Sequence, residues 1–477
     1  MKESRFTADT PGRVAWHRLR TRARRLSTPP RLLAGSFLLL IAAGTLGLRT
    51  LPGLYSGDRL GWLDSLFTAT SAVCVTGLIV VDTATYFTPA GQAYLLLLIQ
   101  LGGLGILTLT SLVILALGGR PSLRHEAAAS AGVDVAPQVD FRRLSRRIVS
   151  FTILFEIVGA LLLFAVWAPR FGPGKALWHA GFHSVSAFCN AGFSTFSDSL
   201  VSLSRDSWTL LVISGLVVVG GLGFLTMEEV DLWRRTRRSS GVRRFRVSLH
   251  SRLVLSVTGI LLLGGWILFA LFEWRNTLAG MPPPARVVNA LFMSVTARTA
   301  GFNSVDYAQT AEASSFLTIL LMAVGGSPGS TAGGLKTTTF ALIALLAWSR
   351  WRGRRATSLW SRTIPEETTQ RCVGLCVFAF SLMTVAIFVY TVTEIGVTGP
   401  AADGGFIHYM FETVSAFNTV GLSMGVTGDL SAPGRVLTIL LMYLGRIGPL
   451  SFAAAIALHD DGRARRFRFA RENVVIG

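Results

Sequence analysis

The sequence predicts an all-α polytopic membrane protein with four parallel repeats, each containing two membrane helices and a short segment between them. Three observations support this: long stretches without charge, a glycine motif that recurs four times, and basic clusters at alternate gaps. A bilayer core of ~30 Å needs about 20 apolar residues of helix. Six stretches approach or exceed that length without a charged residue: 32–48, 83–119, 207–227, 253–272, 313–335 and 372–393.

The positive charges predict the orientation of these helices. The chain carries 45 Lys and Arg residues against 26 Asp and Glu. Most of the positive charges lie in five clusters, within residues 1–31, 120–147, 234–252, 350–371 and 463–471. The clusters fall at every second gap between apolar stretches, as in cytoplasmic loops, so we expect a plasma (inner) membrane protein with both termini in the cytoplasm. No soluble fold surrounds the clusters, so we expect them to bind anionic membrane lipids rather than nucleic acid.

A short motif occurs four times in the chain. In every copy a run of mostly small and apolar residues ends at a Gly, and Leu or Phe follows this Gly. The copies are Ser71–Leu78, Ser186–Phe193, Val295–Phe302 and Ser415–Leu422. Their glycines, Gly77, Gly192, Gly301 and Gly421, lie 115, 109 and 120 positions apart. Four copies at such regular spacing predict an internal repeat that spans almost the whole chain.

Each repeat begins with a long apolar helix, followed by a segment too short to cross a bilayer, the motif, and a second helix. The short segments, which have the length of re-entrant helices, are 61–71, 175–187, 286–296 and 405–416. We expect the first helices near 31–51, 148–168, 253–272 and 372–393, and the second helices near 92–117, 207–227, 313–348 and 435–458. Each repeat crosses the membrane twice, so all four share one orientation and can surround a common axis.

The predicted organisation has six parts. They are a cytoplasmic basic tail (1–30), repeat one (31–118), repeat two with a preceding cytoplasmic loop (119–230), repeat three (231–349), repeat four (350–459) and a second cytoplasmic basic tail (460–477). The second helices carry glycine clusters that begin 25, 28, 24 and 24 residues after the motif glycine, at Gly102, Gly220, Gly325 and Gly445. Close packing between membrane helices is the alternative explanation of these clusters.

The motif predicts a cation path lined by backbone carbonyl groups. Irregular backbone at membrane depth is tolerated only where it is buried in protein or faces water. The motif residues are mostly small and uncharged, and rings of carbonyls can replace the hydration shell of K⁺. Gly permits the backbone turn that aims carbonyls at an axis, and the C-terminal ends of the short helices favour a cation there. The predicted ion-binding residues are Val75, Thr76, Gly77, Asn190, Ala191, Gly192, Thr299, Ala300, Gly301, Thr419, Val420 and Gly421.

Four such units, each with one motif glycine, resemble the Ktr/Trk/HKT superfamily of potassium transporters. Segments 296–303, 325–336 and 445–450 are especially similar to the Ktr-type membrane subunit (KtrB), and the resemblance covers about residues 31–459. The short tail before repeat one also favours the Ktr type over the Trk type. The resemblance implies M1–P-loop–M2 repeats around a central pseudo-fourfold pore and a selectivity filter for K⁺. It further implies Na⁺-dependent uptake, a homodimer, and gating by a cytosolic nucleotide-binding ring of the KtrA type.

Residues 325–334 interrupt the second helix of repeat three with Pro328 and several glycines. A Pro in mid-helix costs about 3 kcal/mol or more. The resemblance implies an intramembrane loop that gates the pore, and a kinked helix is the alternative. The predicted gating residues are Gly325, Gly326, Ser327, Pro328, Gly329, Ser330, Thr331, Ala332, Gly333, Gly334, Lys336 and Arg446.

Arg446 divides the second helix of repeat four into two uncharged runs, which places it near the middle of the bilayer. An Arg that faces lipid there costs ~2.5–3.5 kcal/mol on insertion scales, so we expect it to face the pore or a partner. It is either an electrostatic barrier that acts with 325–334 or part of a structural ion pair. Lys336 is expected to neutralise a carboxylate or to extend to the cytoplasmic edge.

Other buried ionisable residues leave alternatives open. Arg298 is expected to point behind the motif and to hold carbonyls or an acidic side chain, with Glu412 as a candidate. Glu156 has either a functional or a structural role. His179 and His183 have the spacing of a metal pair, but without a third ligand we expect a packing role. The four cysteines are expected to be free thiols.

Two other classes of function compete with potassium uptake. The motif is short enough to permit a nonselective or sodium-permeable cation channel. An intramembrane enzyme would need a nucleophile with a base or a metal cluster, and the sequence offers neither. We therefore expect a transporter that is not an enzyme, which carries K⁺, with Na⁺ as a further ion, and holds no organic cofactor.

Overall fold

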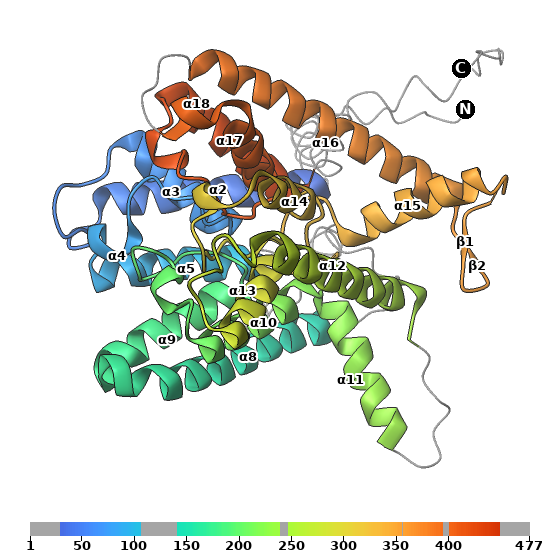
Figure 1. Ribbon diagram of the computed structural model, residues 1–477, viewed down its shortest axis with the longest axis horizontal. Helices are drawn as coiled ribbons and strands as arrows, with labels where there is room; N and C mark the ends of the chain where they lie inside the picture. The colour runs from blue at the N-terminus through green and yellow to red at the C-terminus, as the bar shows by residue number, and fades with distance from the viewer. Residues whose placement is uncertain (1–28, 106–140, 239–246, 355, 395–399, 449–477) are drawn as a thin grey trace, which may run out of the picture.

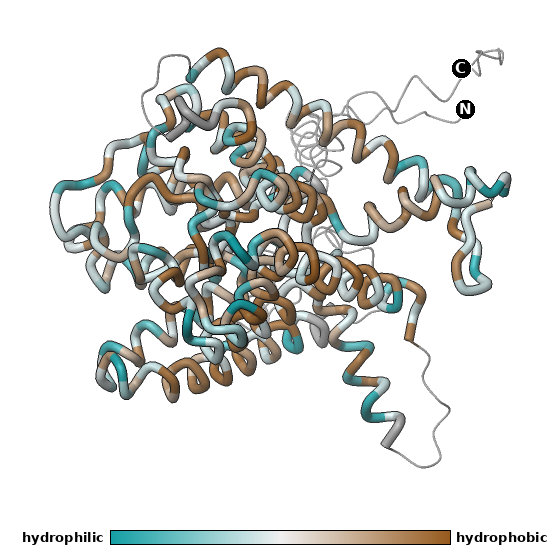
Figure 2. The backbone as a smooth tube through the Cα atoms, viewed as in Figure 1, coloured by the Kyte–Doolittle hydropathy of each residue, from teal (hydrophilic) through white to brown (hydrophobic). Residues whose placement is uncertain are grey.

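The computed structural model describes residues 29–105, 141–238, 247–354, 356–394 and 400–448, and nearly all their regular structure is helical (Figure 1). Among the described residues, four helices are long and apolar enough to span a membrane over most of their length. They are α2 (Pro29–Thr50), α8 (Phe141–Phe171), α12 (Leu249–Glu273) and α16 (Glu366–Thr393). The prediction of a mostly helical chain with apolar, membrane-length helices is confirmed, and Figure 2 shows long hydrophobic runs along α8, α12 and α16.

A shorter helix follows each of these four. The short helices are α3 (Trp62–Cys74), α9 (Pro173–Phe188), α13 (Pro283–Thr296) and α17 (Pro400–Phe417). Prolines stand in the first turns of α9 and α13, where the missing N–H costs no hydrogen bond. Within α17 the chain bends at Gly405, whose φ is 52°. The predicted re-entrant segments therefore correspond to helices of 13 to 18 residues.

The helices after the motif are also short. They are α5 (Pro89–Leu104), α10 (Ser207–Gly221), α14 (Glu312–Met322) and α18 (Ala432–Ile447), preceded by α4 (Thr83–Tyr86) and the single turns η1 (Val201–Leu203), η2 (Tyr307–Gln309) and η3 (Thr427–Asp429). The side chains of Thr88, Asp206 and Ser431 cap the starts of α5, α10 and α18. The predicted continuations of the first and last of these helices, to 117 and 458, lie outside the described residues.

The helix predicted over 207–227 is broken, which corrects the sequence prediction. Helix α11 (Phe224–Arg238) leaves α10 at 99°. Gly223 takes a φ of +87° at the break, and the freed backbone groups bond to segment 325–334: Ser327 N–H donates to Gly221 at 3.0 Å, and Phe224 N–H donates to Gly329 at 3.0 Å. Hydrogen bonds from a segment one hundred residues away therefore replace those of a continuous helix.

The helices contact one another in an order that closes on itself. Each first helix packs against the short helix that follows it. Each helix after the motif then packs against the short helix of the next unit: α5 on α9, α10 on α13, α14 on α17, and α18 back on α3. Helix α18, near the end of the chain, thus lies beside α3, near its start (Figure 1).

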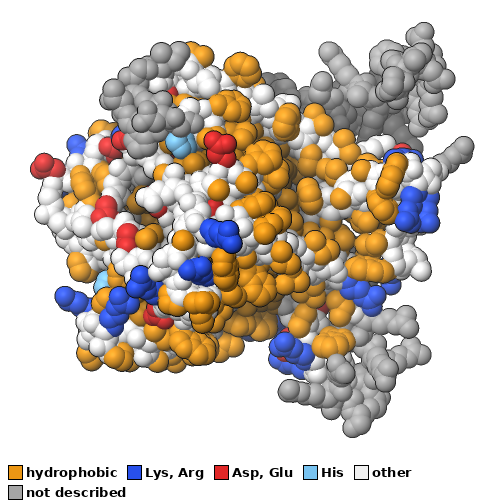
Figure 3. All heavy atoms as spheres, viewed as in Figure 1, with side chains coloured by type: hydrophobic (Ala, Val, Ile, Leu, Met, Phe, Trp, Pro, Cys, Tyr) orange, Lys and Arg blue, Asp and Glu red, His pale blue; other side chains and the backbone are white. Residues whose placement is uncertain are grey.

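Charge is distributed unevenly along the molecule. In Figure 3 hydrophobic side chains cover the middle of the visible face, and Lys and Arg dominate the right-hand side beside α11 and the hairpin of β1 (Ser358–Leu359) and β2 (Arg362–Thr363). The opposite side, near α4 and α9, carries charges of both signs. Helix α15 (Thr337–Trp351) leads to the hairpin, so the described parts of two predicted cytoplasmic clusters, 234–252 and 350–371, lie on the same side.

Candidate ion-binding site

The four motifs adopt one repeated backbone turn directly after the short helices. We call residues 75–77, 190–192, 299–301 and 419–421 the glycine turns. In each, the last residue is a glycine with positive φ and the first is a non-glycine residue in the left-handed region. The φ values are 57° and 93° for Val75 and Gly77, 59° and 70° for Asn190 and Gly192, 67° and 77° for Thr299 and Gly301, and 51° and 92° for Thr419 and Gly421.

Three of the four left-handed non-glycine residues are β-branched, a residue type that rarely adopts positive φ. Such a conformation costs on the order of 1–3 kcal/mol and persists only where the surrounding structure enforces it. The sequence predicted Val75, Thr299 and Thr419 as ion-binding residues but not their left-handed conformation, because nothing in a β-branched residue signals a left-handed turn. The same left-handed conformation in all four copies, strained in three of them, indicates that the turns serve a function.

Hydroxyl groups near the ends of the short helices fasten the turns. Ser71 accepts a hydrogen bond from the N–H of Gly77 at 3.1 Å and donates to the carbonyl of Leu78 at 2.7 Å. The equivalent hydroxyls repeat parts of this pattern: Ser186 donates to Phe193 at 2.8 Å, Thr296 donates to Phe302 at 2.7 Å, and Ser415 accepts from Gly421 at 3.1 Å. These hydrogen bonds fix the backbone beside each turn, but none of them is made to a carbonyl of the turn itself.

The carbonyl oxygens of the turns have no hydrogen-bond donor among the described residues. More than nine in ten buried backbone carbonyls in proteins are paired, so a cluster of unpaired ones requires an explanation. Nearly all of these residues are buried. The twelve carbonyls belong to the residues that the sequence predicted as the ion-binding set, Val75 to Gly77, Asn190 to Gly192, Thr299 to Gly301 and Thr419 to Gly421.

The glycine turns lie against one another in a closed cycle. A Cβ atom on Gly77 would lie 2.5 Å from the carbonyl oxygen of Ala191, one on Gly192 would lie 2.9 Å from that of Ala300, and one on Gly301 would lie 2.6 Å from that of Val420. The cycle ends where it began, because a Cβ atom on Gly421 would collide with the carbonyl oxygen of Thr76. The structure thus brings together all twelve predicted ion-binding residues, and only glycine fits at the four contacts.

The glycine clusters of the later helices pack on the same backbone. A Cβ atom at Gly102, Gly220 or Gly445 would collide with the carbonyl oxygen four residues before the motif glycine of its own unit, at Val73, Phe188 and Phe417. This close approach explains why each cluster lies at a similar distance along the chain from its motif glycine. In the third unit Gly325 faces Gly333 and Leu335 instead, because the chain leaves the helix there.

Segment 325–334 contacts the second and the fourth units. Its middle is held by Thr331, whose hydroxyl donates to Phe188 at 3.2 Å and to Gly220 at 3.1 Å. At its end, Gly334 N–H donates to Gly445 at 3.2 Å. The segment separates α14 from α15, so the predicted interruption of the second helix in repeat three is present.

Arg446 and Lys336 both bond to this segment. Arg446 donates to the carbonyl of Thr331 and, at 2.5 Å, to that of Gly102 on α5. Lys336 donates to Ala332 at 2.7 Å. Neither side chain forms an ion pair among the described residues, so the structural ion pair suggested for Arg446 and the carboxylate partner suggested for Lys336 are not found there. Backbone carbonyls satisfy both charges instead.

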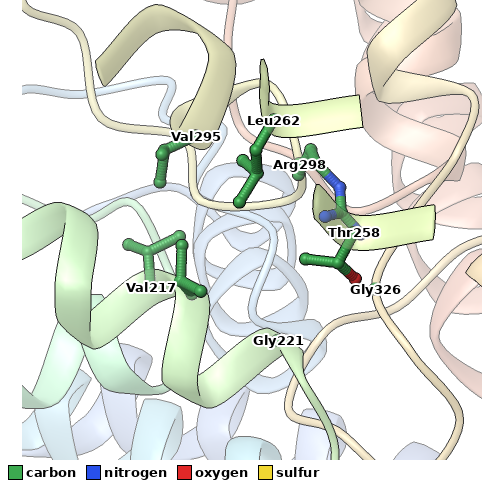
Figure 4. Close-up of a pocket in the computed structure, with 8 residues that line it drawn as sticks. Val217, Gly221, Thr258, Leu262, Val295, Arg298 and Gly326 are labelled. Carbon is green, nitrogen blue, oxygen red and sulfur yellow. The ribbon is translucent and has the colours of Figure 1, made fainter. Parts of the chain in front are cut away.

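Arg298 lies behind the third glycine turn, and its side chain is 7% exposed. It donates to the carbonyl of Gly325 at 3.4 Å. Figure 4 shows it extending toward Thr258 and Gly326 across a small cavity, with Val217, Leu262 and Val295 on the other side. Arg298 therefore holds a carbonyl, one of the two predicted partners.

The proposed pairing of Arg298 with Glu412 is wrong, because Glu412 has other partners. Its carboxylate accepts hydrogen bonds from Ser423 at 3.0 Å and from Thr427 at 2.6 Å. His183, nine residues before its motif glycine as Glu412 is, similarly bonds to Ser194 at 2.9 Å. Both side chains tie the chain after the glycine turn to the short helix before it.

The remaining candidates have structural partners. Gln100 donates to Glu156 at 3.2 Å, and the thiol of Cys189 lies 3.4 Å from Gln100. His179 bonds to Thr195 at 2.6 Å. No group of three metal-ligating side chains occurs among the described residues, and all four cysteines are free thiols.

Comparison with known proteins identifies the family. The family model described as TrkH, cation transport protein, matches residues 9–465. The chain belongs to this family. The predicted resemblance to the Ktr/Trk/HKT superfamily is thereby confirmed.

Its relatives include two bacterial uptake proteins. The chain is 37% identical over 463 residues to the "Potassium/sodium uptake protein NtpJ" of Enterococcus hirae, a match that covers 96% of this chain and 99% of that protein. It is 39% identical over 430 residues to the "Ktr system potassium uptake protein B" of Vibrio alginolyticus, over 90% and 91% of the two chains.

A solved structure shares the fold. The potassium transporter TrkH from Vibrio parahaemolyticus superposes with a TM-score of 0.66 at 18% identity, over 89% of this chain and 83% of that chain. Family and relatives are transporters of cations, which agrees with the predicted class of a membrane transporter rather than an enzyme.

Proposed function

We propose that this protein takes up potassium ions across the plasma membrane through a selectivity filter formed by the twelve carbonyls of the glycine turns. The observation that carries the proposal is the closed cycle of four turns whose buried carbonyls have no described donor. Carbonyl rings of this kind can replace the hydration shell of K⁺. The names of the relatives, which are potassium uptake proteins, support the choice of ion.

The filter proposal implies an architecture of four M1–P-loop–M2 units around a central pseudo-fourfold pore. The cyclic packing order of the helices and the cyclic contacts of the glycines both support it. The C-terminal ends of α3, α9, α13 and α17 lead directly into the turns, so their partial negative charges favour a cation there.

Segment 325–334 is proposed as the gate, together with Lys336 and Arg446. A fixed positive charge beside the pore repels K⁺, and two unit charges ~4 Å apart at an effective dielectric near 20 interact by about 4 kcal/mol. The guanidinium of Arg446 bonds to carbonyls on the segment and on α5, without a described carboxylate to offset its charge. Movement of the segment would therefore move this charge as well.

A cytosolic nucleotide-binding ring of the KtrA type is proposed to act on the gate, and the membrane chain is proposed to be a homodimer with Na⁺-dependent uptake. Helix α11 offers a connection between such a ring and the gate, because it extends from the break at Gly223 to the basic side of the molecule. Phe224, at its start, bonds to Gly329 of the segment. A partner that displaces α11 would pull on the segment through this contact.

A sodium-permeable cation channel is the second candidate. The specific observation in its favour is the name of the Enterococcus hirae relative, which includes sodium as well as potassium. Both candidates use the same carbonyl path and differ in how strongly the path prefers K⁺ over Na⁺.

The two candidates are tested by expressing the chain in cells that lack potassium uptake, with and without a cytosolic partner, and by measuring uptake of each ion. The proposal predicts growth at limiting K⁺ and K⁺ uptake that excess Na⁺ does not compete away. Uptake of both ions at similar rates would favour the sodium-permeable channel, and absence of uptake of either ion with a partner present would overturn both.

A further inference from the structure

The glycine turns and the gate segment are in direct contact. In the fourth unit the position three residues before the motif glycine is Asn418, which is fully buried. Its side-chain oxygen accepts a hydrogen bond from the N–H of Leu335 at 3.1 Å, and its side-chain nitrogen donates to Val414 on α17 at 3.1 Å. One side chain thus joins the end of segment 325–334 to the helix that carries the fourth turn.

Two glycines of the segment fit closely against the same turn. A Cβ atom on Gly334 would lie 2.5 Å from the side-chain oxygen of Asn418 and 2.7 Å from its Cα atom. A Cβ atom on Gly333 would collide with the side chain of Thr419, the left-handed residue of the turn. Movement of this end of the segment would therefore alter its contacts with Asn418 and Thr419.

The other end of the segment has a similar connection to the third turn. Arg298 occupies the same position, three residues before its motif glycine, and donates to the first carbonyl of the segment, that of Gly325, at 3.4 Å. The equivalent residues of the first two units are Cys74 and Cys189. This position carries a guanidinium or amide group only in the third and fourth units, where it bonds to the two ends of the segment.

We propose that Asn418 and Arg298 are positioning residues that couple the gate to the filter, so that the ion preference of the filter depends on the position of segment 325–334. The inference rests on the proposed function and adds regulation of selectivity to it. If the segment stabilises one arrangement of the third and fourth turns, the turns equally stabilise one position of the segment, because such coupling is reciprocal. Partner binding would then change both flux and ion preference.

The test is a double-mutant cycle between Asn418→Ala and Gly334→Ala in the full chain reconstituted in liposomes, with the K⁺-over-Na⁺ preference of flux as the readout. Each single variant is expected to lower the preference by about fivefold, the effect of one net hydrogen bond on an equilibrium. The double variant is expected to lower the K⁺ preference no further than either single variant does, because both substitutions remove the same contact.

Cys74→Ala is the matched control, because it changes the same position in a unit that does not border the segment, and its preference is expected to stay at the wild-type value. If Asn418→Ala protein does not fold, Gly333→Ala and Gly334→Ala test the contact from the side of the segment. Wild-type preference in these variants, or strictly additive losses in the cycle, would overturn the coupling while leaving the proposed function intact. Failure of the wild-type chain to transport K⁺ would overturn the proposed function and the coupling with it.

Discussion

The backbone of Gly421 in the fourth unit lies against the carbonyl oxygen of Thr76 in the first, so close that no Cβ atom fits between them. This contact joins the two ends of a cycle that begins with Gly77 against Ala191. A side chain at any one of the four glycines therefore displaces a carbonyl of the neighbouring unit. The first prediction follows from that geometry.

Replacing Gly77 by Ser is expected to weaken the preference for K⁺ over Na⁺ by about tenfold, equivalent to ~1.4 kcal/mol. The new Cβ atom would lie 2.5 Å from the carbonyl oxygen of Ala191, at a φ of +93°. Competition between the two ions in liposome flux is the measurement. Gly53→Ser is the control, since Gly53 has a φ of +77° and no atom within 4 Å of an added Cβ. Unchanged competition in all four Gly→Ser variants would contradict the assignment of the filter.

The hydroxyl of Ser71 is expected to stabilise the first turn. Ser71→Ala leaves the N–H of Gly77 and the carbonyl of Leu78 without this partner, so the chain should lose on the order of 1–3 kcal/mol of stability together with part of its K⁺ preference. Thermal unfolding and ion competition measure the two effects. Thr68→Val, on the same helix, is the control because the hydroxyl of Thr68 is buried without a described partner. Equal behaviour of the two variants would refute the anchoring role.

Shortening segment 325–334 is expected to raise K⁺ flux and to reduce its dependence on the cytosolic partner. The backbone N–H groups of Ser327, Thr331 and Gly334 donate to α10 and α18, and removing residues opens these contacts. Flux of reconstituted protein with and without the partner is the measurement. A shortened chain that folds, as judged by its thermal transition, and still transports at the wild-type rate would place the gate elsewhere.

Arg446→Gln keeps hydrogen-bonding groups near Thr331 and Gly102 but removes the charge. We expect faster K⁺ flux, because a repulsion of about 4 kcal/mol at ~4 Å would be lost. Flux and thermal stability are measured on the same preparation. Flux equal to or below that of the wild type, together with lower stability, would show that Arg446 is a purely structural bridge.

The sequence could predict the features that repeat and the residues that only glycine can provide. Gly102, Gly220 and Gly445 lie at similar distances along the chain from their motif glycines, because each one packs on backbone of its own unit. The break after Gly221 could not be predicted, because it depends on hydrogen bonds to Ser327 and its neighbours, far away in sequence. Local patterns carry no information on such distant partners.

Side-chain partners were predicted less well for the same reason. Charge complementarity suggested Glu412 for Arg298, but nearby hydroxyls at Ser423 and Thr427 satisfy the carboxylate first. The left-handed conformation of Val75 is likewise imposed by the assembled turns and contradicts its own preference. Asn418 stood in the motif without a distinguishing signal, although in the fold it joins α17 to the end of segment 325–334.

The most direct test of the account is to locate bound ions by anomalous diffraction from crystals of the protein in Rb⁺, a substitute for K⁺. The account predicts a peak enclosed by the carbonyl oxygens of the four glycine turns, around Gly77, Gly192, Gly301 and Gly421, and a weaker peak in Gly77→Ser crystals. Rb⁺ peaks only at other sites, or a peak that persists unchanged in Gly77→Ser, would contradict it.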